Sequence, residues 1–254
     1  MSVELRFYAE LNDLLPPERR GHSFAVDVSP GATVKDLVES LGVPHTEIEV
    51  ILVNQESVDF SHRIKGGDRI SVYPVFEALD VAPIIRLRST PLRDPRFVVD
   101  VHLGRLVRHL RLLGFDTLWS NTFSDEELVR LSRQDNRILL TRDRGLLKRR
   151  AVTHGYLVRD TSPRGQTEEV LRRFDLAGGI NAFSRCLECN GRIESVAKAD
   201  VDALLPPRTR HDYQDFRRCE ECGRVYWQGS HFDRLRTLVE DVRRRCSPHP
   251  ESRQ

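Results

Sequence analysis

The chain has 254 residues, of which 39% are hydrophobic and 31% are charged. This composition is typical of a soluble globular protein, and no stretch approaches the roughly 20 apolar residues that span a bilayer, which excludes a membrane protein. The first residues carry charges where a secretory signal needs an apolar run, so we expect a cytoplasmic protein with reduced cysteines.

The net charge of +2 conceals a contrast between the two ends of the chain. Residues 1–83 hold 7 Lys and Arg against 14 Asp and Glu, whereas residues 84–254 hold 33 against 24. Most basic residues of the second part are arginines, which favour bidentate contacts to phosphate. The contrast indicates a domain boundary and makes RNA a candidate partner, although arginine also dominates the proteins of GC-rich organisms.

Residues 1–80 are predicted to form a small β-grasp domain. Alternating apolar and polar residues predict four strands, at 3–9, 22–28, 48–54 and 68–76. Between the two strand pairs, apolar residues at helical spacing predict a short helix that Thr33 caps and Gly42 ends. The order of two strands, a helix and two strands is that of ubiquitin-like folds.

The stretch SPGATVKDLVESLGVP, at 29–44, resembles the small sulfur-carrier proteins of molybdopterin and thiamine synthesis. Those carriers work through a free C-terminal Gly-Gly, whereas the corresponding point here reads VYPVFEALDVAP and the chain continues. We therefore expect this domain to serve binding or stability, with a protein as its candidate partner, and not sulfur transfer.

The pattern changes after residues 81–95, which contain three prolines among charges and are predicted to be a linker. Apolar strands then alternate with amphipathic helices over 96–178. The predicted strands lie at 96–100, 115–120, 137–143 and 156–160, and the helices at 102–114, 124–135 and 166–175. Repeated strand–helix units favour an α/β fold with a parallel sheet and helices on both faces.

Carboxylates follow two of these strands. Asp100 and Asp143 each come after an apolar run, and the carboxyl ends of parallel strands share one rim of the sheet. Asp125 and Glu126 lie in the first turn of an intervening helix, and either one can face that rim. Converging carboxylates would bind a hard cation such as Mg²⁺ or Mn²⁺ and activate water for phosphodiester hydrolysis. Each acid alone is equally well explained by turn formation or the helix dipole.

Arginines accompany these acids. Arg142 and Arg144 flank Asp143, and Arg105 lies about one helical turn after Asp100. All three are candidates to hold substrate phosphate. In the helix 102–114, arginines 105, 108 and 111 lie opposite the apolar side, so a solvated helix face explains Arg105 as well.

Three motifs, VVDVHLGRLVRHLRLLGFDT, SDEEL and ILLTRDRGLL, resemble the PIN-like RNase family named for the C-terminal domain of the Mut-7 exonuclease. The resemblance covers residues 95–235, and bacterial members also carry an N-terminal ubiquitin-like domain. It implies a PIN-like α/β fold and metal-dependent RNase activity, with the acidic roles on Asp100, Asp125 and Asp143. PIN-type sites often have a fourth acid, for which we favour Glu126 over Asp160.

Two Cys-x-x-Cys knuckles follow, separated by 29 residues. Their four thiols are those of Cys186, Cys189, Cys219 and Cys222. Paired knuckles are typical of a tetrahedral Zn²⁺ site, and four protein ligands leave no open position, so the zinc is expected to be structural. The spacer is long enough for an inserted strand pair or turn. Residues 179–246 are therefore predicted to form a zinc ribbon and a C-terminal helix.

Aromatic residues follow the second knuckle, at Tyr226, Trp227 and Phe232. They are suited to stacking on RNA bases, but burial is the default for large aromatics, and we favour packing of the ribbon. The leading hypothesis is a metal-dependent ribonuclease. The alternatives are a non-catalytic RNA- or ribosome-binding zinc-ribbon protein and an adaptor that recruits a partner through its β-grasp domain.

Overall fold

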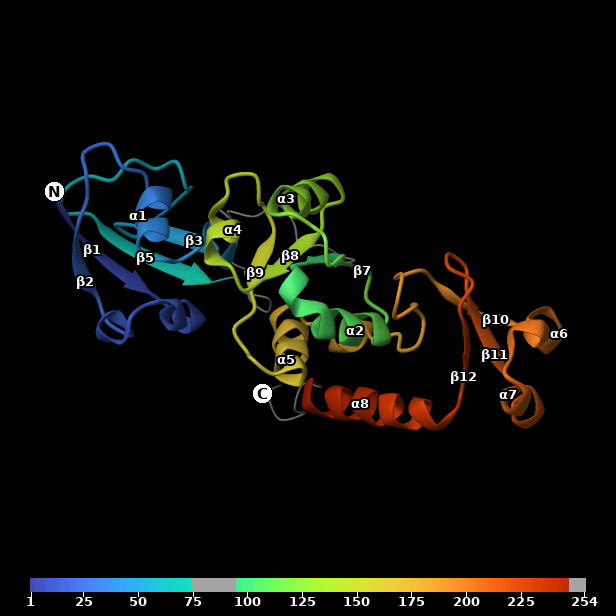
Figure 1. Cartoon of the computed structure of the whole chain (residues 1–254). Coiled ribbons are helices and arrows are strands. Elements are labelled where there is room, and N and C mark those ends of the chain that lie inside the picture. The colour runs from blue at the N-terminus through green and yellow to red at the C-terminus, as the bar shows by residue number, and fades with distance from the viewer. Residues whose placement is uncertain (75–94, 247–254) are drawn as a thin grey trace. The chain divides into compact units, whose positions relative to one another are not determined.

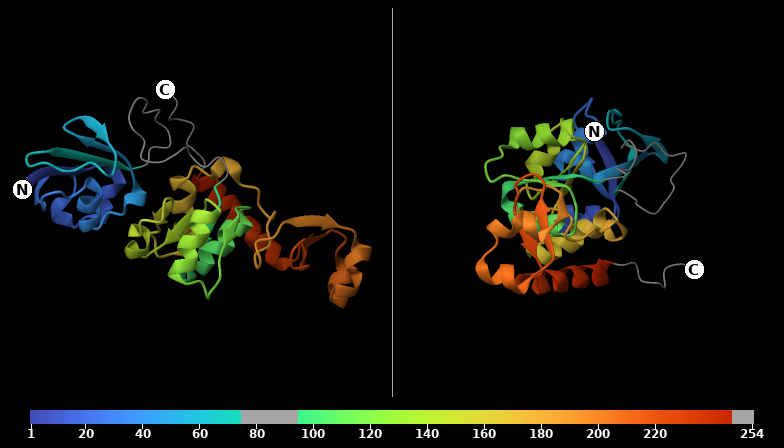
Figure 2. Two further views of the ribbon diagram at one scale, coloured as in Figure 1. Left: turned by 90° about the horizontal axis from the view of Figure 1, so that it is seen from above. Right: turned by 90° about the vertical axis from the view of Figure 1, so that its right-hand side faces the viewer.

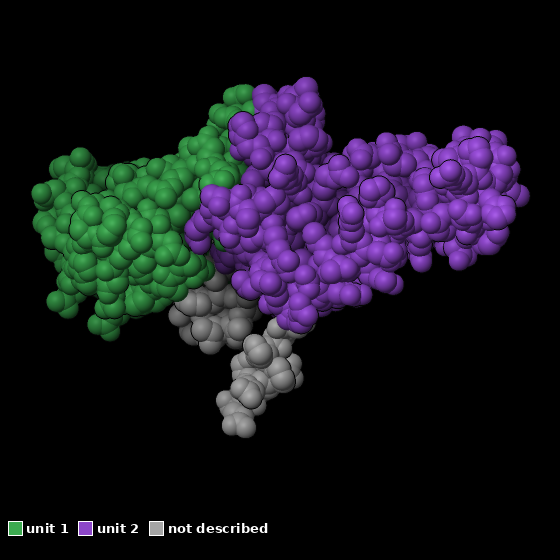
Figure 3. Space-filling model, turned by 60° about the horizontal axis from the view of Figure 1, so that its bottom comes forward, with its two compact units in different colours: residues 1–94, 125–157 green, residues 95–124, 158–254 purple. Residues whose placement is uncertain are grey.

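The computed structural model describes residues 1–74 and 95–246 (Figure 1). They belong to two compact units, one of residues 1–94 and 125–157 and the other of residues 95–124 and 158–254 (Figure 3). The predicted linker lies outside the described residues, except for Pro95. Among the helices of the described ranges, none combines the length and apolar character needed to cross a membrane.

The N-terminal part of the first unit is a β-grasp fold. Its strands are β1 (Ser2–Phe7), β2 (Phe24–Asp27), β3 (Ile48–Val53), β4 (Glu56–Val58) and β5 (Arg69–Pro74). They form one sheet in the order β2-β1-β5-β3-β4, in which β1 is antiparallel to β2 and parallel to β5. Inward residues of β1 and β5 are buried at every second position. The predicted β-grasp fold is confirmed, and the short strand β4 is an addition.

Helix α1 (Val34–Ser40) forms where the sequence predicts it. The Thr33 hydroxyl accepts the N–H of Asp36 at 3.2 Å, and the Asp36 carboxylate accepts the N–H of Thr33 at 3.0 Å. This capping box satisfies donors that the first helical turn leaves unpaired. Gly42, at φ 91°, takes the left-handed conformation that ends many helices.

The same unit contains four elements of the α/β region. They are α3 (Asp125–Gln134), β8 (Ile138–Thr141), α4 (Arg144–Lys148) and β9 (Gly155–Leu157). β8 and β9 pair in parallel, with Leu140 opposite Tyr156. All four residues of β8 are buried, as expected for a strand with both faces covered.

Polar contacts join the β-grasp fold to these elements within the unit. The 3₁₀ turn His45–Glu47 carries two of them. The Glu47 carboxylate accepts the Leu157 N–H at 2.8 Å, and an imidazole nitrogen of His45 lies 2.9 Å from the Val152 carbonyl oxygen. Lys148 donates to the Glu39 carbonyl at 2.7 Å. The ubiquitin-like fold is therefore part of the unit that presents α4.

Glu47 gives this contact a test. Glu47 is 1% exposed, so the Glu47→Ala substitution leaves the buried N–H of Leu157 without its acceptor. We expect the free energy of unfolding to fall by about 1–3 kcal/mol, measured by urea denaturation. Glu47→Gln retains an acceptor oxygen and should lose less, and the exposed Glu56→Ala serves as the control. Equal midpoints for the Glu47→Ala and Glu56→Ala variants would refute this contribution.

The second unit holds the other half of the α/β pattern. Its elements are β6 (Phe97–Val99), the 3₁₀ turn Val101–Leu103, α2 (Gly104–Leu112), β7 (Thr117–Leu118) and α5 (Pro163–Arg173). β6 and β7 pair in parallel, and α2 packs against α5. The two parallel pairs with their helices confirm the predicted α/β class. The predicted strand 115–120 shrinks to two residues.

The C-terminal part of this unit is a three-stranded antiparallel sheet with the order β10-β11-β12. The strands are β10 (Ile193–Val196), β11 (Phe216–Cys219) and β12 (Val225–Trp227), with the short helices α6 (Lys198–Val201) and α7 (Pro207–Asp212) between β10 and β11. Val201, Leu205 and Phe216 form a small core there. Helix α8 (Ser230–Cys246) follows and packs on α5 (Figure 2). Arg164 of α5 pairs there with Asp241 of α8 at 2.9 Å.

Candidate metal centre and acidic residues

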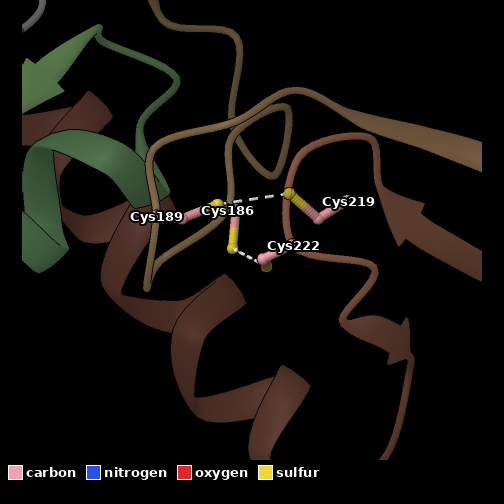
Figure 4. Close-up of side chains that lie close together, drawn as sticks. All are labelled: Cys186, Cys189, Cys219 and Cys222. Carbon is pink, nitrogen blue, oxygen red and sulfur yellow. Dashed lines mark hydrogen bonds between the residues drawn. The ribbon is translucent and has the colours of Figure 1, made fainter.

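The four cysteines of the two knuckles converge on one point (Figure 4). Their sulfur atoms all lie within 4.8 Å of one another, with Cys186 and Cys222 3.7 Å apart and Cys189 and Cys219 3.4 Å apart. Zinc–sulfur bonds of about 2.3 Å in a tetrahedron require sulfur separations of about 3.8 Å. The thiols therefore form a cluster of the size and donor type that suits a metal ion such as zinc.

Tight turns place these thiols. Asn190, at φ 72°, and Gly223, at φ 71°, follow the two knuckles in the left-handed conformation. In each knuckle an N–H turns back to the carbonyl of the first cysteine, from Asn190 to Cys186 and from Gly223 to Cys219, both at 3.0 Å. Each turn directs the two thiols of its knuckle to the same side.

The thiols also affect one another's protonation. Burial opposes ionisation of Cys186, but backbone hydrogen bonds near Cys189 and the Tyr226 hydroxyl, 3.0 Å away, lower its pKa to about 6. Burial raises the pKa of Cys189 to about 12, and the neighbouring Cys219 thiol acts in the same direction. The Gly191 N–H has the opposite effect and lowers this pKa, but it does not outweigh the burial. Ionisation of all four thiols so close together would require a cation to offset their mutual repulsion.

Buried polar contacts tie the first knuckle to the α/β elements of its unit. Arg111 of α2 is 3% exposed and donates to the carbonyls of Leu187 and Glu188, at 3.1 and 2.6 Å, and to that of Thr117 at 3.0 Å. The Asn190 side chain accepts the Thr117 N–H at 2.9 Å. The sequence groups Arg111 with Arg105 and Arg108 on the polar side of the helix. Arg105 and Arg108 are exposed, but Arg111 is buried, so that expectation is wrong for Arg111, which holds the knuckle.

The aromatic residues after the second knuckle divide in their roles. Tyr226 contacts the Cys186 sulfur, and the Phe232 ring lies 4.6 Å from that of Phe183. Trp227, by contrast, is 36% exposed. Packing is therefore confirmed for Tyr226 and Phe232, while Trp227 presents part of its indole to solvent.

Three of the predicted acids belong to the first unit and Asp100 belongs to the second. Asp143 is the N-cap of α4, and its carboxylate accepts the Gly145 N–H at 2.7 Å. It lies two residues beyond the end of β8 and not directly after it. Asp100 directly follows β6, as predicted.

Asp125 and Glu126 begin α3 and share one basic partner. Arg149 donates to Asp125 at 2.8 Å and to Glu126 at 3.1 Å. Both carboxylates are largely exposed, at 48% and 77% of their side chains, so each pair contributes about 1 kcal/mol or less. A bound cation or phosphate can displace such pairs at little cost. No sequence pattern singled out Arg149; its position after a short helix gave no signal.

The arginines predicted to hold phosphate are all exposed. Arg105 lies on α2 and Arg142 follows β8. Arg144, the first residue of α4, donates to the Leu14 carbonyl at 3.2 Å within the first unit. Asp160, the alternative fourth acid, accepts the backbone and hydroxyl hydrogen bonds of Ser162 at 2.7 and 2.9 Å.

Comparison with known proteins matches two family models. The Mut7-C RNAse domain model matches residues 95–239, and the Mut7-C ubiquitin model matches residues 1–80. SAMP1 from Haloferax volcanii is 24% identical, with a TM-score of 0.25 and a match covering 31% of this chain and 99% of SAMP1. Another crystal structure, of H. volcanii small archaeal modifier protein 1, is 23% identical, with a TM-score of 0.24 and a match covering 29% of this chain and 95% of that protein. No curated protein matches the chain.

Proposed function

Because the chain belongs to the Mut7-C RNAse domain family, we propose that it is a metal-dependent ribonuclease that hydrolyses RNA phosphodiester bonds. The family match carries this proposal, since it extends over 95–239 and includes the predicted acids and all four clustered cysteines. The prediction of a nuclease and of an N-terminal ubiquitin-like domain agrees with the two matched models. We further propose that the protein acts in the cytoplasm, where thiols stay reduced.

In this proposal, Asp100, Asp125 and Asp143 hold Mg²⁺ or Mn²⁺, because carboxylate oxygens are the ligands that hard cations prefer. The bound cation would supply an activated water and stabilise charge on the leaving oxygen. Glu126, beside Asp125, is the proposed fourth acid. Arg105, Arg142 and Arg144 are proposed to orient substrate phosphates, for which guanidinium groups are geometrically suited.

The cysteine cluster is proposed to hold zinc with a structural role. Four sulfur ligands fill a tetrahedral site and leave no position for water or substrate. The Arg111 contacts to the first knuckle support this role, because they link the cluster to the elements around α2. The three sequence domains, 1–80, 96–178 and 179–246, would then act as ubiquitin-like, nuclease and ribbon parts, and a protein is the proposed partner of the first.

A cleavage assay tests the proposal. Labelled single-stranded and structured RNA would be incubated with the wild-type chain and Mn²⁺, Mg²⁺ or neither, and with the Asp100→Asn variant. We expect products only with divalent cation and none above background from the variant. RNA binding that persists without metal, with no products from any substrate, would refute the nuclease and favour the RNA-binding alternative, which the exposed Trp227 also suits.

A further inference from the structure

We propose that a basic groove formed by α3 and the segment after α4 binds the phosphate backbone of the RNA substrate. The inference rests on the proposed nuclease function and adds a substrate-binding surface to it. The groove has a volume of about 750 Å³ and lies wholly within the first unit. Its lining residues are Glu126, Val129, Arg130, Arg133, Gln134, Arg149, Arg150 and Ala151.

The charge of this lining is strongly one-sided. Four arginines face one glutamate, which leaves three positive charges in excess. Arg130 and Arg133 come from one side of α3, three residues apart, whereas Arg149 and Arg150 come from the chain after α4. Two elements that are distant in sequence thus bring guanidinium groups to one hollow. A solvated basic face of α3 would explain Arg130 and Arg133, but it would not explain why Arg149 and Arg150 line the same hollow.

Most of this positive charge has no partner to neutralise it. Among the residues that the structure describes, neither Arg133 nor Arg150 has a side-chain hydrogen bond or ion pair, and both are exposed. Arg130 donates to the neutral Gln134 amide at 2.7 Å. Of the four arginines, Arg149 alone pairs with carboxylates of the described residues, those of Asp125 and Glu126. Clustered guanidinium groups repel one another, and a polyanion that contacts several of them relieves that repulsion.

The position of the groove favours RNA over other anions. Arg149 and Glu126 line it. Glu126 is the second residue of α3, and Arg149 donates to it and to Asp125, the proposed metal ligand at the start of that helix. A strand bound along the groove would therefore lead directly to the proposed site of cleavage. The exposed Arg149 pairs are weak enough for phosphate to replace a carboxylate. Val129 and Ala151 add apolar lining beside the charges.

The test measures binding of a labelled single-stranded RNA by fluorescence anisotropy over a range of salt concentrations. The Asp143→Asn background keeps the RNA intact. Arg133→Gln with Arg150→Gln is expected to raise the Kd on the order of tenfold or more. The slope of log K against log salt should fall by about 0.7 for each phosphate that the variant no longer neutralises. Arg133→Lys with Arg150→Lys keeps the charge and should restore most of the slope.

The matched control removes two exposed arginines of the β-grasp fold, Arg6→Gln with Arg63→Gln. If the Arg133→Gln, Arg150→Gln variant bound RNA with the same affinity and the same salt slope as the control, the inference would be overturned. Cleavage of RNA by the wild type would still uphold the proposed nuclease in that case. Groove-dependent binding without cleavage by the wild type would support the groove and refute the nuclease. Thermal melting of each variant excludes unfolding as the cause of weaker binding.

Discussion

Replacing Asp143 by asparagine is expected to abolish RNA cleavage while leaving the fold intact. The carboxylate has two roles, as the N-cap of α4 and as a proposed metal ligand, and the substitution separates them. Asparagine caps helices as well as aspartate does, so its side-chain oxygen can still accept the Gly145 N–H. It lacks the charge that a hard divalent cation prefers.

Removing a residue that only supports a metal ligand typically costs roughly 10–100-fold in activity. Because Asp143 is proposed to contact the metal directly, Asp143→Asn is expected to reduce turnover by more than that. Asp143→Ala should lose the same activity and also about 0.5–2 kcal/mol of stability, because the cap disappears. The measurement is single-turnover cleavage with Mn²⁺, together with urea denaturation of each variant. The exposed Asp13→Asn in the β-grasp fold is the control. Wild-type turnover by the Asp143→Asn variant would show that the acidic mechanism is assigned to the wrong residue.

Loss of one cysteine of the cluster should have the second large effect. We expect the wild-type chain to contain one zinc ion and the Cys219→Ser variant to contain none at micromolar zinc. Structural zinc sites contribute on the order of 10–16 kcal/mol of apparent binding free energy, most of which is folding free energy of the surrounding segment. The ribbon has a small core of its own, around Val201, Leu205 and Phe216, so it should unfold without the ion.

Metal analysis and limited proteolysis check this expectation. The Cys219→Ser chain should be cut within β10–β12, while the β-grasp fold resists the protease. The control is Cys246→Ser, because Cys246 ends α8 and lies outside the cluster. A Cys219→Ser variant that retains stoichiometric zinc would contradict the four-sulfur site.

The sequence predicted elements whose signal is local. The helix after Thr33 has its cap, its periodicity and its terminal glycine within ten residues, and both boundaries are confirmed. Strand β4 was missed because Glu-Ser-Val offers three residues without a clear alternation; it forms through pairing with β3. The strand expected at 115–120 was too long, because only Thr117 and Leu118 have a paired neighbour.

In the candidate site, too, local sequence signals were predictive and contacts between distant residues were not. The cysteine cluster was predictable because spacing alone identifies a pair of knuckles. Arg111 and Arg149 were not, because their roles depend on partners about 76 and 24 residues away. The catalytic roles of Asp100, Asp125, Glu126 and Asp143, and the phosphate-binding roles of the flanking arginines, stay predictions. The Asp100→Asn and Asp143→Asn variants test two of these acids.

The first unit is discontinuous in sequence, since residues 125–157 join it after an excursion of thirty residues that belong to the other unit. A ribosome delivers the chain from the N-terminus, so the β-grasp sheet can pair its strands long before the carboxylate of Glu47 meets the Leu157 N–H. During that interval the face around the 3₁₀ turn His45–Glu47 is uncovered. Chaperones have access to this face throughout the interval, so the yield of active protein should depend on the rate of synthesis as well as on the stability of the finished unit.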